Sequence, residues 1–172
     1  DLARSRGLGD VYKRQVFLVI LWLIGTKKND TSYKVQSLNI FYMIVGGFIL
    51  YIILNQFLPV RPRPETVSHI PPLLHHLPDN SFPSGHAIFA AASWLGVRIF
   101  TWSLRLSIFV LILGIVMNLA RIVAGIHYPG DILVGYLVGF IWAAIIYFLH
   151  RKALFRKWLT PFFLKLASYL RL

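Results

Sequence analysis

Long apolar runs alternate with short polar segments along this chain. A helix needs roughly 20 residues to cross the hydrocarbon of a bilayer. Several runs approach or reach that length, and an apolar segment before them has about half of it. The runs cover residues 38–57, 83–100, 104–123 and 132–149, and the shorter segment covers residues 16–25. The pattern predicts an all-α, polytopic transmembrane helix bundle of about five visible helices, the first of them incomplete.

The polar segments between the runs differ in character. Residues 26–34 predict a short loop, and residues 58–82 form a long connector rich in proline and histidine. Gly125, Pro129 and Gly130 predict a turn between the last two runs. No internal repeat separates the apolar runs into groups, so residues 16–172 are interpreted as one membrane domain.

Basic residues are concentrated in alternate segments. One set of loops, with the tail, holds Lys27, Lys28, Lys34, Arg98, Arg105, Arg151, Lys152, Arg156, Lys157, Lys165 and Arg171. The opposite set holds only Arg61, Arg63 and Arg121. Because Lys and Arg gather in cytoplasmic loops, we expect the second set on the periplasmic, extracytoplasmic face. From Pro161 onward the tail interleaves aromatic and basic residues, which predicts an interfacial helix.

Composition supports the membrane class. Hydrophobic residues make up 57% of the chain and charged residues 14%. The absence of cysteine from the sequence excludes disulfides and thiolate metal sites. A net charge of +12 would suit a nucleic-acid partner, but its distribution over alternate loops favours a membrane topology instead. We therefore expect a lipid bilayer and no nucleic acid as partner.

The N-terminal segment requires a separate interpretation. The run Asp10-Val11-Tyr12-Lys13-Arg14-Gln15 resembles a translated transposase-end adapter from a sequencing library. A genuine basic arm is the alternative. We expect residues 1–15 to be non-native and leave them out of the fold argument.

Three polar motifs fall on the predicted outer face, at the ends of apolar runs. They are Arg61-Pro62-Arg63-Pro64, Pro83-Ser84-Gly85-His86, and Arg121 with His127 and Asp131. Ionisable residues at membrane boundaries are functional candidates because burying them is costly. Arginine presents a planar fork of donors that matches phosphate oxygens. Ser84 and Gly85 open a predicted helix, where backbone N–H groups form an anion site.

Two histidines supply chemistry suited to such an anion. His86 directly follows the predicted anion site and is placed to donate a proton to one of its oxygens. His127 and Asp131 are four residues apart, so one helical turn would bring them together. A carboxylate on one imidazole nitrogen fixes the tautomer and leaves the other nitrogen to attack. It also stabilises the cationic phosphohistidine that would form.

These motifs resemble the three-part signature of the type 2 phosphatidic acid phosphatases. That superfamily also includes undecaprenyl-diphosphate phosphatases, glucose-6-phosphatase and vanadium haloperoxidases. The resemblance implies a six-helix bundle, of which this chain would lack the first helix and part of the second. It implies that His127 becomes phosphorylated with support from Asp131, and that His86 protonates the leaving group. It also implies that the phosphoryl oxygens are held by Arg63, Ser84, Gly85 and Arg121.

Two positions depart from the family's pattern. The lysine that opens the first motif, seven positions before its Arg-Pro, is Gln56 here, and the serine before the third motif's arginine is Ala120. Loss of an ammonium weakens charge neutralisation at a phosphate site, and Arg61 is a candidate to compensate. Gln56 and Arg61 therefore complete the set of candidate phosphate-binding residues.

The sequence thus favours a metal-independent membrane lipid phosphatase without a cofactor. A prenyl diphosphate like undecaprenyl diphosphate is the expected substrate, because two neighbouring guanidinium groups suit a diphosphate. Phosphatidic acid and phosphatidylglycerol phosphate are the alternatives, and a catalytically impaired relative that binds or transports lipid is an alternative of another class. No carboxylate lies usefully near His69, His75 and His76, so a zinc site is not expected there. The oligomeric state stays open.

Overall fold

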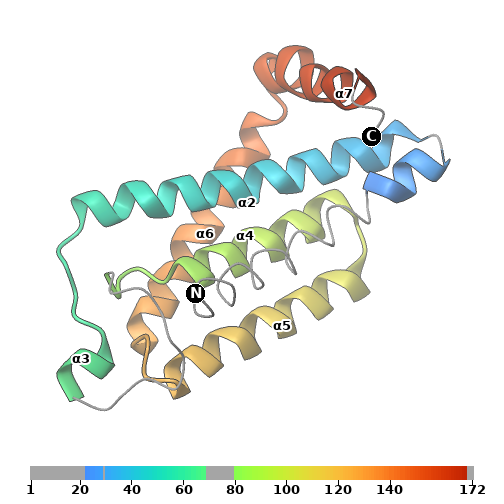
Figure 1. Cartoon of the computed structure of the whole chain (residues 1–172). Coiled ribbons are helices and arrows are strands. Elements are labelled where there is room, and N and C mark those ends of the chain that lie inside the picture. The colour runs from blue at the N-terminus through green and yellow to red at the C-terminus, as the bar shows by residue number, and fades with distance from the viewer. Residues whose placement is uncertain (1–21, 29, 69–79, 170–172) are drawn as a thin grey trace. The chain divides into compact units, whose positions relative to one another are not determined.

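The computed structural model describes residues 22–28, 30–68 and 80–169, and all regular structure within them is helical (Figure 1). The elements are α2 (Thr31–Phe57), α3 (Pro64–Ser68), α4 (Gly85–Phe100), α5 (Leu104–Val123), α6 (Pro129–Leu149), the π-helical segment η1 (Leu154–Leu159) and α7 (Thr160–Tyr169). Residues 22–28 are helical as well. The predicted all-α class is confirmed. Residues 1–15 and the histidines at 69, 75 and 76 lie outside the described residues, so the expectations for them stay predictions.

Among the described residues, three helices, α2, α5 and α6, are long and apolar enough to cross a membrane, and α4 is a shorter apolar helix. Helix α5 shows the surface expected of a span, because apolar side chains such as Phe109 (62% exposed) and Val116 (58%) point away from the protein. Such side chains are stable in contact with lipid, while backbone polar groups are satisfied within each helix.

The chain divides into two compact units. Unit 1 combines Asp1–Tyr42 with Ala144–Leu172, and unit 2 is Met43–Ala143. In unit 1 the ring of Tyr42 lies 5.5 Å from that of Phe155 and 5.9 Å from that of Phe163. The tail is therefore helical and packed through aromatic residues. It becomes helical at Leu154, earlier than the predicted start at Pro161.

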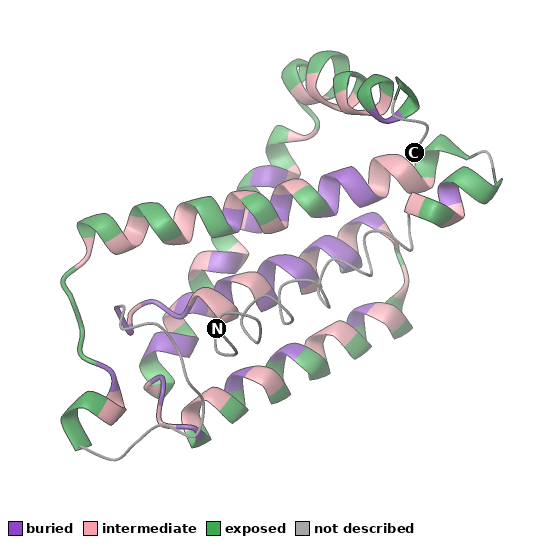
Figure 2. Cartoon of the chain, in the orientation of Figure 1, coloured by how far each residue is buried: buried purple, intermediate pink, exposed green. Residues whose placement is uncertain are grey.

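Unit 2 is built around α4, much of which is buried (Figure 2). Most of its buried residues are small. The α4 residues with at most 4% exposure are Ala87, Ala90, Ala91 and Ala92, together with Ile88 and Val97. Glycines of the neighbouring helices pack on these small residues. A Cβ atom at Gly114 of α5 would lie 2.9 Å from that of Ala90, and one at Gly139 of α6 would lie 2.6 Å from that of Ala91. Small residues let the backbones approach closely, which brings the ends of α4, α5 and α6 together.

The start of α2 differs from the prediction. It begins at Thr31 instead of residue 38, because the Asp30 carboxylate accepts a hydrogen bond from the Ser32 N–H (2.8 Å) and caps the helix. Polar residues therefore form its first turns. Since residues 26–28 are helical too, the predicted loop at 26–34 is much shorter than expected.

Helix α6 also begins earlier than predicted, at Pro129 instead of residue 132. Proline suits the first helical position because its missing N–H would have no partner there. Asp131 accepts from the Tyr128 N–H (2.9 Å) and completes the cap. Pro129 and Gly130 thus belong to the helix, and of the three predicted turn residues only Gly125, with φ +73°, lies in the connection.

Candidate active site

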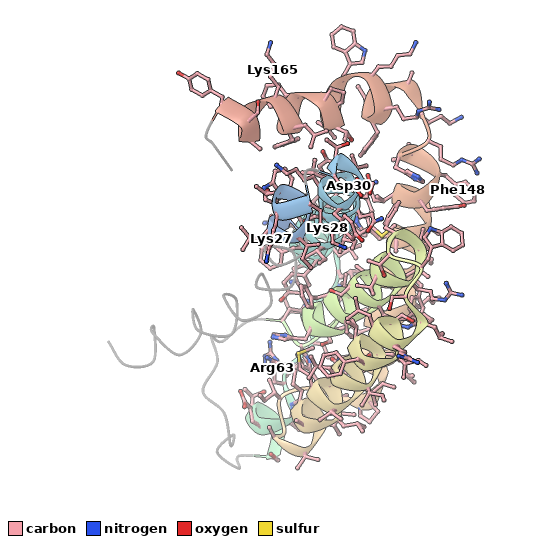
Figure 3. The ribbon with its side chains drawn as sticks, turned by 90° about the vertical axis from the view of Figure 1, so that its right-hand side faces the viewer. Lys27, Lys28, Asp30, Arg63, Phe148 and Lys165 are labelled. Atoms are coloured by element: carbon pink, nitrogen blue, oxygen red, sulfur yellow. The ribbon has the colours of Figure 1, made fainter. Side chains whose placement is uncertain are left out.

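The candidate residues come from segments that meet at one end of unit 2. These segments are the stretch before α3, where Figure 3 labels Arg63, the start of α4, the end of α5 and the connection to α6. Backbone hydrogen bonds join them. The N–H of Ser84 donates to the carbonyl of Asp131 (3.0 Å), and the N–H of Glu65 donates to the carbonyl of Gly125 (3.2 Å). Residues far apart in sequence are therefore held side by side.

His127 is almost fully buried, with 4% of its surface exposed. Its Nδ1 lies 2.9 Å from the carbonyl oxygen of Ser81, which can only accept. We therefore assign the proton to Nδ1, which leaves a lone pair on Nε2. Nη1 of Arg63 lies 3.4 Å from Nε2 and also donates to the carbonyl of Ile126 (2.9 Å). The free nitrogen of the imidazole thus faces a guanidinium group.

The surroundings of His127 keep its imidazole neutral. Burial lowers the pKa of His127 to about 4, and the positive charges of Arg63 and Arg121 act in the same direction. The carbonyl of Ser81 and the carboxylate of Asp131 oppose this shift but are outweighed. At neutral pH the Nε2 lone pair is therefore available for attack on an electrophile.

Asp131 is fully buried, and both of its carboxylate oxygens accept hydrogen bonds. Its Oδ1 accepts from Nη1 of Arg61 at 2.7 Å, and its Oδ2 accepts from the hydroxyl of Ser81 at 2.5 Å and from the N–H of Tyr128. The distance from Oδ2 to Nδ1 of His127 is 3.7 Å. The expected direct hydrogen bond is thus replaced by one to the carbonyl of Ser81. The reason is that His127 precedes the first turn of α6, so helical spacing does not apply to it.

Arg61 lies at the rim of the cluster, with 44% of its side chain exposed. Besides its bond to Asp131, its guanidinium group lies 4.2 Å from the ring centre of Tyr128, a cation–π distance. Arg61 is therefore fixed in place while part of its surface faces outward. By contrast Arg63 is buried, with 6% exposed.

The second histidine also contacts an arginine. Nη2 of Arg121 lies 2.5 Å from Nε2 of His86, so this nitrogen accepts in the structure. The neighbouring Ser84 is fully buried at the start of α4, yet its hydroxyl makes no capping bond and no hydrogen bond within the described residues. Together with the adjacent Gly85, it presents unused hydrogen-bonding capacity at a helix N-terminus.

Gln56 comes from α2, which supplies none of the other candidate residues. It is the penultimate residue of α2 and is exposed, and within the described residues no hydrogen bond links it to the other candidates. The structure therefore brings Arg61, Arg63, Ser84, Gly85, His86, Arg121, His127 and Asp131 into one cluster, and the role of Gln56 stays a prediction.

Sequence reasoning missed three residues that organise the cluster: Ser81, Asn80 and Tyr128. The side-chain oxygen of Asn80 accepts from the N–H groups of Arg61 (2.9 Å) and Phe82 (3.1 Å), which fastens the connector to the first motif. The only signal available in the sequence was the proximity of Asn80 and Ser81 to the second motif. Because their contacts depend on the fold, spacing alone does not reveal them.

Comparisons with known proteins identify the family of this chain. A family model described as the PAP2 superfamily matches residues 36–155. The chain belongs to this family. The resemblance seen in the three motifs is thereby confirmed. With its apolar helices, the chain is a multi-pass membrane protein.

Curated relatives carry phosphatase and transport names. The chain is 30% identical, over 80% of its length, to the bacitracin transport permease protein BcrC of Bacillus licheniformis. It is 31% identical over 72% to the putative undecaprenyl-diphosphatase YbjG of Escherichia coli, and 39% identical over 48% to phosphatidylglycerophosphatase B of Haemophilus influenzae. The chain spans 65%, 59% and 39% of these relatives, respectively. No solved structure matches it.

Proposed function

We propose that this PAP2 protein is a membrane lipid phosphatase that works through a phosphohistidine at His127. The observation that carries the proposal is the state of this imidazole, which is buried and neutral, with Nδ1 bonded to a carbonyl and Nε2 facing Arg63. A fixed tautomer with an available lone pair is what nucleophilic catalysis requires. Nε2 attacks phosphorus, the bond to the leaving oxygen breaks, and water later hydrolyses the phosphohistidine.

The arginines and the start of α4 are proposed to hold the phosphoryl group. Arg63 and Arg121 supply guanidinium donors that neutralise its developing charge, and Ser84 and Gly85 add a hydroxyl and backbone N–H groups. In this mechanism Arg121 shifts from Nε2 of His86 to phosphate oxygens. His86 then carries a proton on Nε2 and delivers it to the leaving oxygen. Because arginines provide the positive charge, we propose a reaction that needs no metal.

A prenyl diphosphate, like undecaprenyl diphosphate, is the proposed substrate. Support comes from the undecaprenyl-diphosphatase name of one relative and from the position of Arg61, fixed at the rim beside the buried Arg63. A second phosphate group would lie against this outer guanidinium group. The phosphatidylglycerophosphatase name of another relative supports the monophosphate alternative.

Arg61 provides the test of substrate class. Arg61→Ala should lower the ratio of diphosphate to monophosphate turnover about tenfold, because only a diphosphate has a second group for the outer guanidinium. The ratio is the appropriate measure, since loss of the bond to Asp131 affects both substrates. Gln56→Lys, which adds an ammonium group, should narrow the difference in turnover between the diphosphate and the monophosphate substrates.

Rates are compared on undecaprenyl diphosphate, phosphatidic acid and phosphatidylglycerol phosphate in detergent. Arg105→Ala is the matched control, because Arg105 lies at the opposite end of α5 from Arg121. A wild-type protein that hydrolyses phosphatidic acid clearly faster than undecaprenyl diphosphate would overturn the substrate assignment. Absence of turnover on all three lipids would favour the lipid-binding or transport alternative.

We propose that the site faces the periplasm, as the charge distribution predicts. Since the sequence contains no cysteine, Ser68→Cys and Lys157→Cys each introduce a single thiol. An impermeant reagent applied to intact cells should label the protein carrying Ser68→Cys and spare the one carrying Lys157→Cys. The reverse labelling pattern would place the site in the cytoplasm.

A further inference from the structure

Ser81 is bonded to both Asp131 and His127. Its hydroxyl donates to Oδ2 of Asp131 at 2.5 Å, and its carbonyl oxygen accepts from Nδ1 of His127 at 2.9 Å. The direct distance between Nδ1 and Oδ2, 3.7 Å, is too long for a hydrogen bond. Ser81 and Asp131 are both 0% exposed. The hydrogen-bonded connection from the carboxylate to the imidazole therefore runs through Ser81.

Asp131 is a fixed anchor for this connection. Its carboxylate is held by the guanidinium group of Arg61 and by the N–H of Tyr128, so its position does not depend on Ser81. The backbone of Ser81 is attached on its other side, where its N–H donates to the carbonyl of Arg61 (3.1 Å). The hydrogen bond from the Ser81 hydroxyl to Oδ2 of Asp131 is therefore the interaction that fixes the Ser81 carbonyl relative to the Asp131 carboxylate.

We propose that Ser81 is a positioning residue through which Asp131 orients His127. The inference rests on the proposed function, because it explains how Asp131 supports the nucleophile. When Nε2 of His127 bonds to phosphorus, the leaving oxygen departs with the electrons of the broken P–O bond and receives a proton from His86. The ring keeps its Nδ1 proton and gains positive charge. A carbonyl held in line with Nδ1 stabilises that charge, and hydrogen bonds to charged groups are the stronger kind.

A double-mutant cycle tests whether the carboxylate acts through Ser81. Ser81→Ala should lower kcat about tenfold and change KM less than about twofold, because the bond it removes serves the reaction step and not lipid binding. Asp131→Ala, which removes the acceptor of the Ser81 hydroxyl, should lower kcat at least as much. The double variant should be no slower than Asp131→Ala alone, since both changes break the same connection. Effects that multiply would show that Asp131 acts on His127 independently and would overturn the proposal.

Solvent exchange of the Nδ1 proton of His127 gives a second readout that does not need turnover. In protein labelled with ¹⁵N-histidine, with His127→Gln used to assign the signal, exchange should accelerate about tenfold in Ser81→Ala, in Asp131→Ala and in the double variant alike. Unchanged exchange in Ser81→Ala would contradict the proposal. If the wild type lacked phosphatase activity, the proposed function would fail while this measurement still decided the role of Ser81.

Two further variants separate loss of the hydroxyl from loss of fold. Ser81→Thr keeps a hydroxyl and should retain most of the wild-type kcat. If the added methyl group of threonine does not fit, Ser81→Cys serves instead. Because its thiol is a weaker donor, its kcat should lie between those of the wild type and Ser81→Ala. Ser107→Ala is the matched control, because Ser107 is 1% exposed and its hydroxyl donates to the carbonyl of Leu104 at the far end of α5. It should leave both readouts unchanged. Equal losses in Ser107→Ala and Ser81→Ala would show a general packing defect instead.

Discussion

Replacement of His127 by alanine is expected to abolish phosphate release, with a fall in kcat on the order of 10⁴-fold or more. The size of the effect follows from the loss of the atom that forms the new bond to phosphorus. The residual rate would come from the arginines and the start of α4, which still bind and polarise the phosphoryl group. Phosphate release from a lipid substrate in detergent measures the change.

His150 offers a matched control for this substitution. Like His127, it places Nδ1 against a backbone carbonyl, that of Tyr147, but it lies at the end of α6 in unit 1. His150→Ala should therefore retain turnover close to that of the wild type. A protein that keeps substantial phosphatase activity without the His127 imidazole would rule out this residue as nucleophile.

The second large effect is expected at His86, and it should depend on the leaving group. His86→Ala should slow hydrolysis of a lipid phosphate on the order of 10²- to 10⁴-fold, because an alkoxide or phosphate leaving group needs a proton. An aryl phosphate, whose phenolate leaves without help, should be slowed much less. The measurement is the ratio of kcat on the two substrates in wild type and variant.

The contact between His86 and Arg121 makes the control important. Loss of the His86 ring also removes a partner of Arg121, which would affect both substrates alike. His86→Gln keeps a polar side chain beside the guanidinium group and should show the same dependence on the leaving group. Equal losses on lipid and aryl phosphates in both variants would remove His86 from the general-acid role.

The helices that follow plain apolar runs were predictable from the sequence. Helix α5 has the predicted bounds, Leu104–Val123, because Ser103 caps its start by accepting from the Leu106 N–H (3.3 Å). Its end is marked by the nearby Gly125. The bounds of α2 and α6 were predicted too late because hydropathy does not register a polar first turn. There, the caps at Asp30 and Asp131 extend each helix beyond its apolar run.

Within the site, the sequence identified most of the residues that form the cluster, but it did not identify their hydrogen-bond partners. Spacing suggested a direct bond from Asp131 to His127, but the imidazole bonds to the carbonyl of Ser81 instead. Backbone carbonyls are the same in every residue, so no sequence pattern identifies the one that faces a given histidine. Gln56 was grouped with the phosphate-binding residues by its position in a motif, and its role stays a prediction because the structure shows only that it is exposed at the end of α2.

The most direct test of the account is to trap the phosphorylated protein. A lipid diphosphate labelled in its terminal phosphate is mixed with the wild-type protein in EDTA, and the reaction is quenched with base, in which phosphohistidine survives. Peptide mass spectrometry should then find phosphate on His127, at levels that Asp131→Asn reduces and His127→Gln eliminates. Phosphate on another residue, release that occurs without a covalent intermediate, or a strict need for a divalent metal would contradict the mechanism proposed for this site.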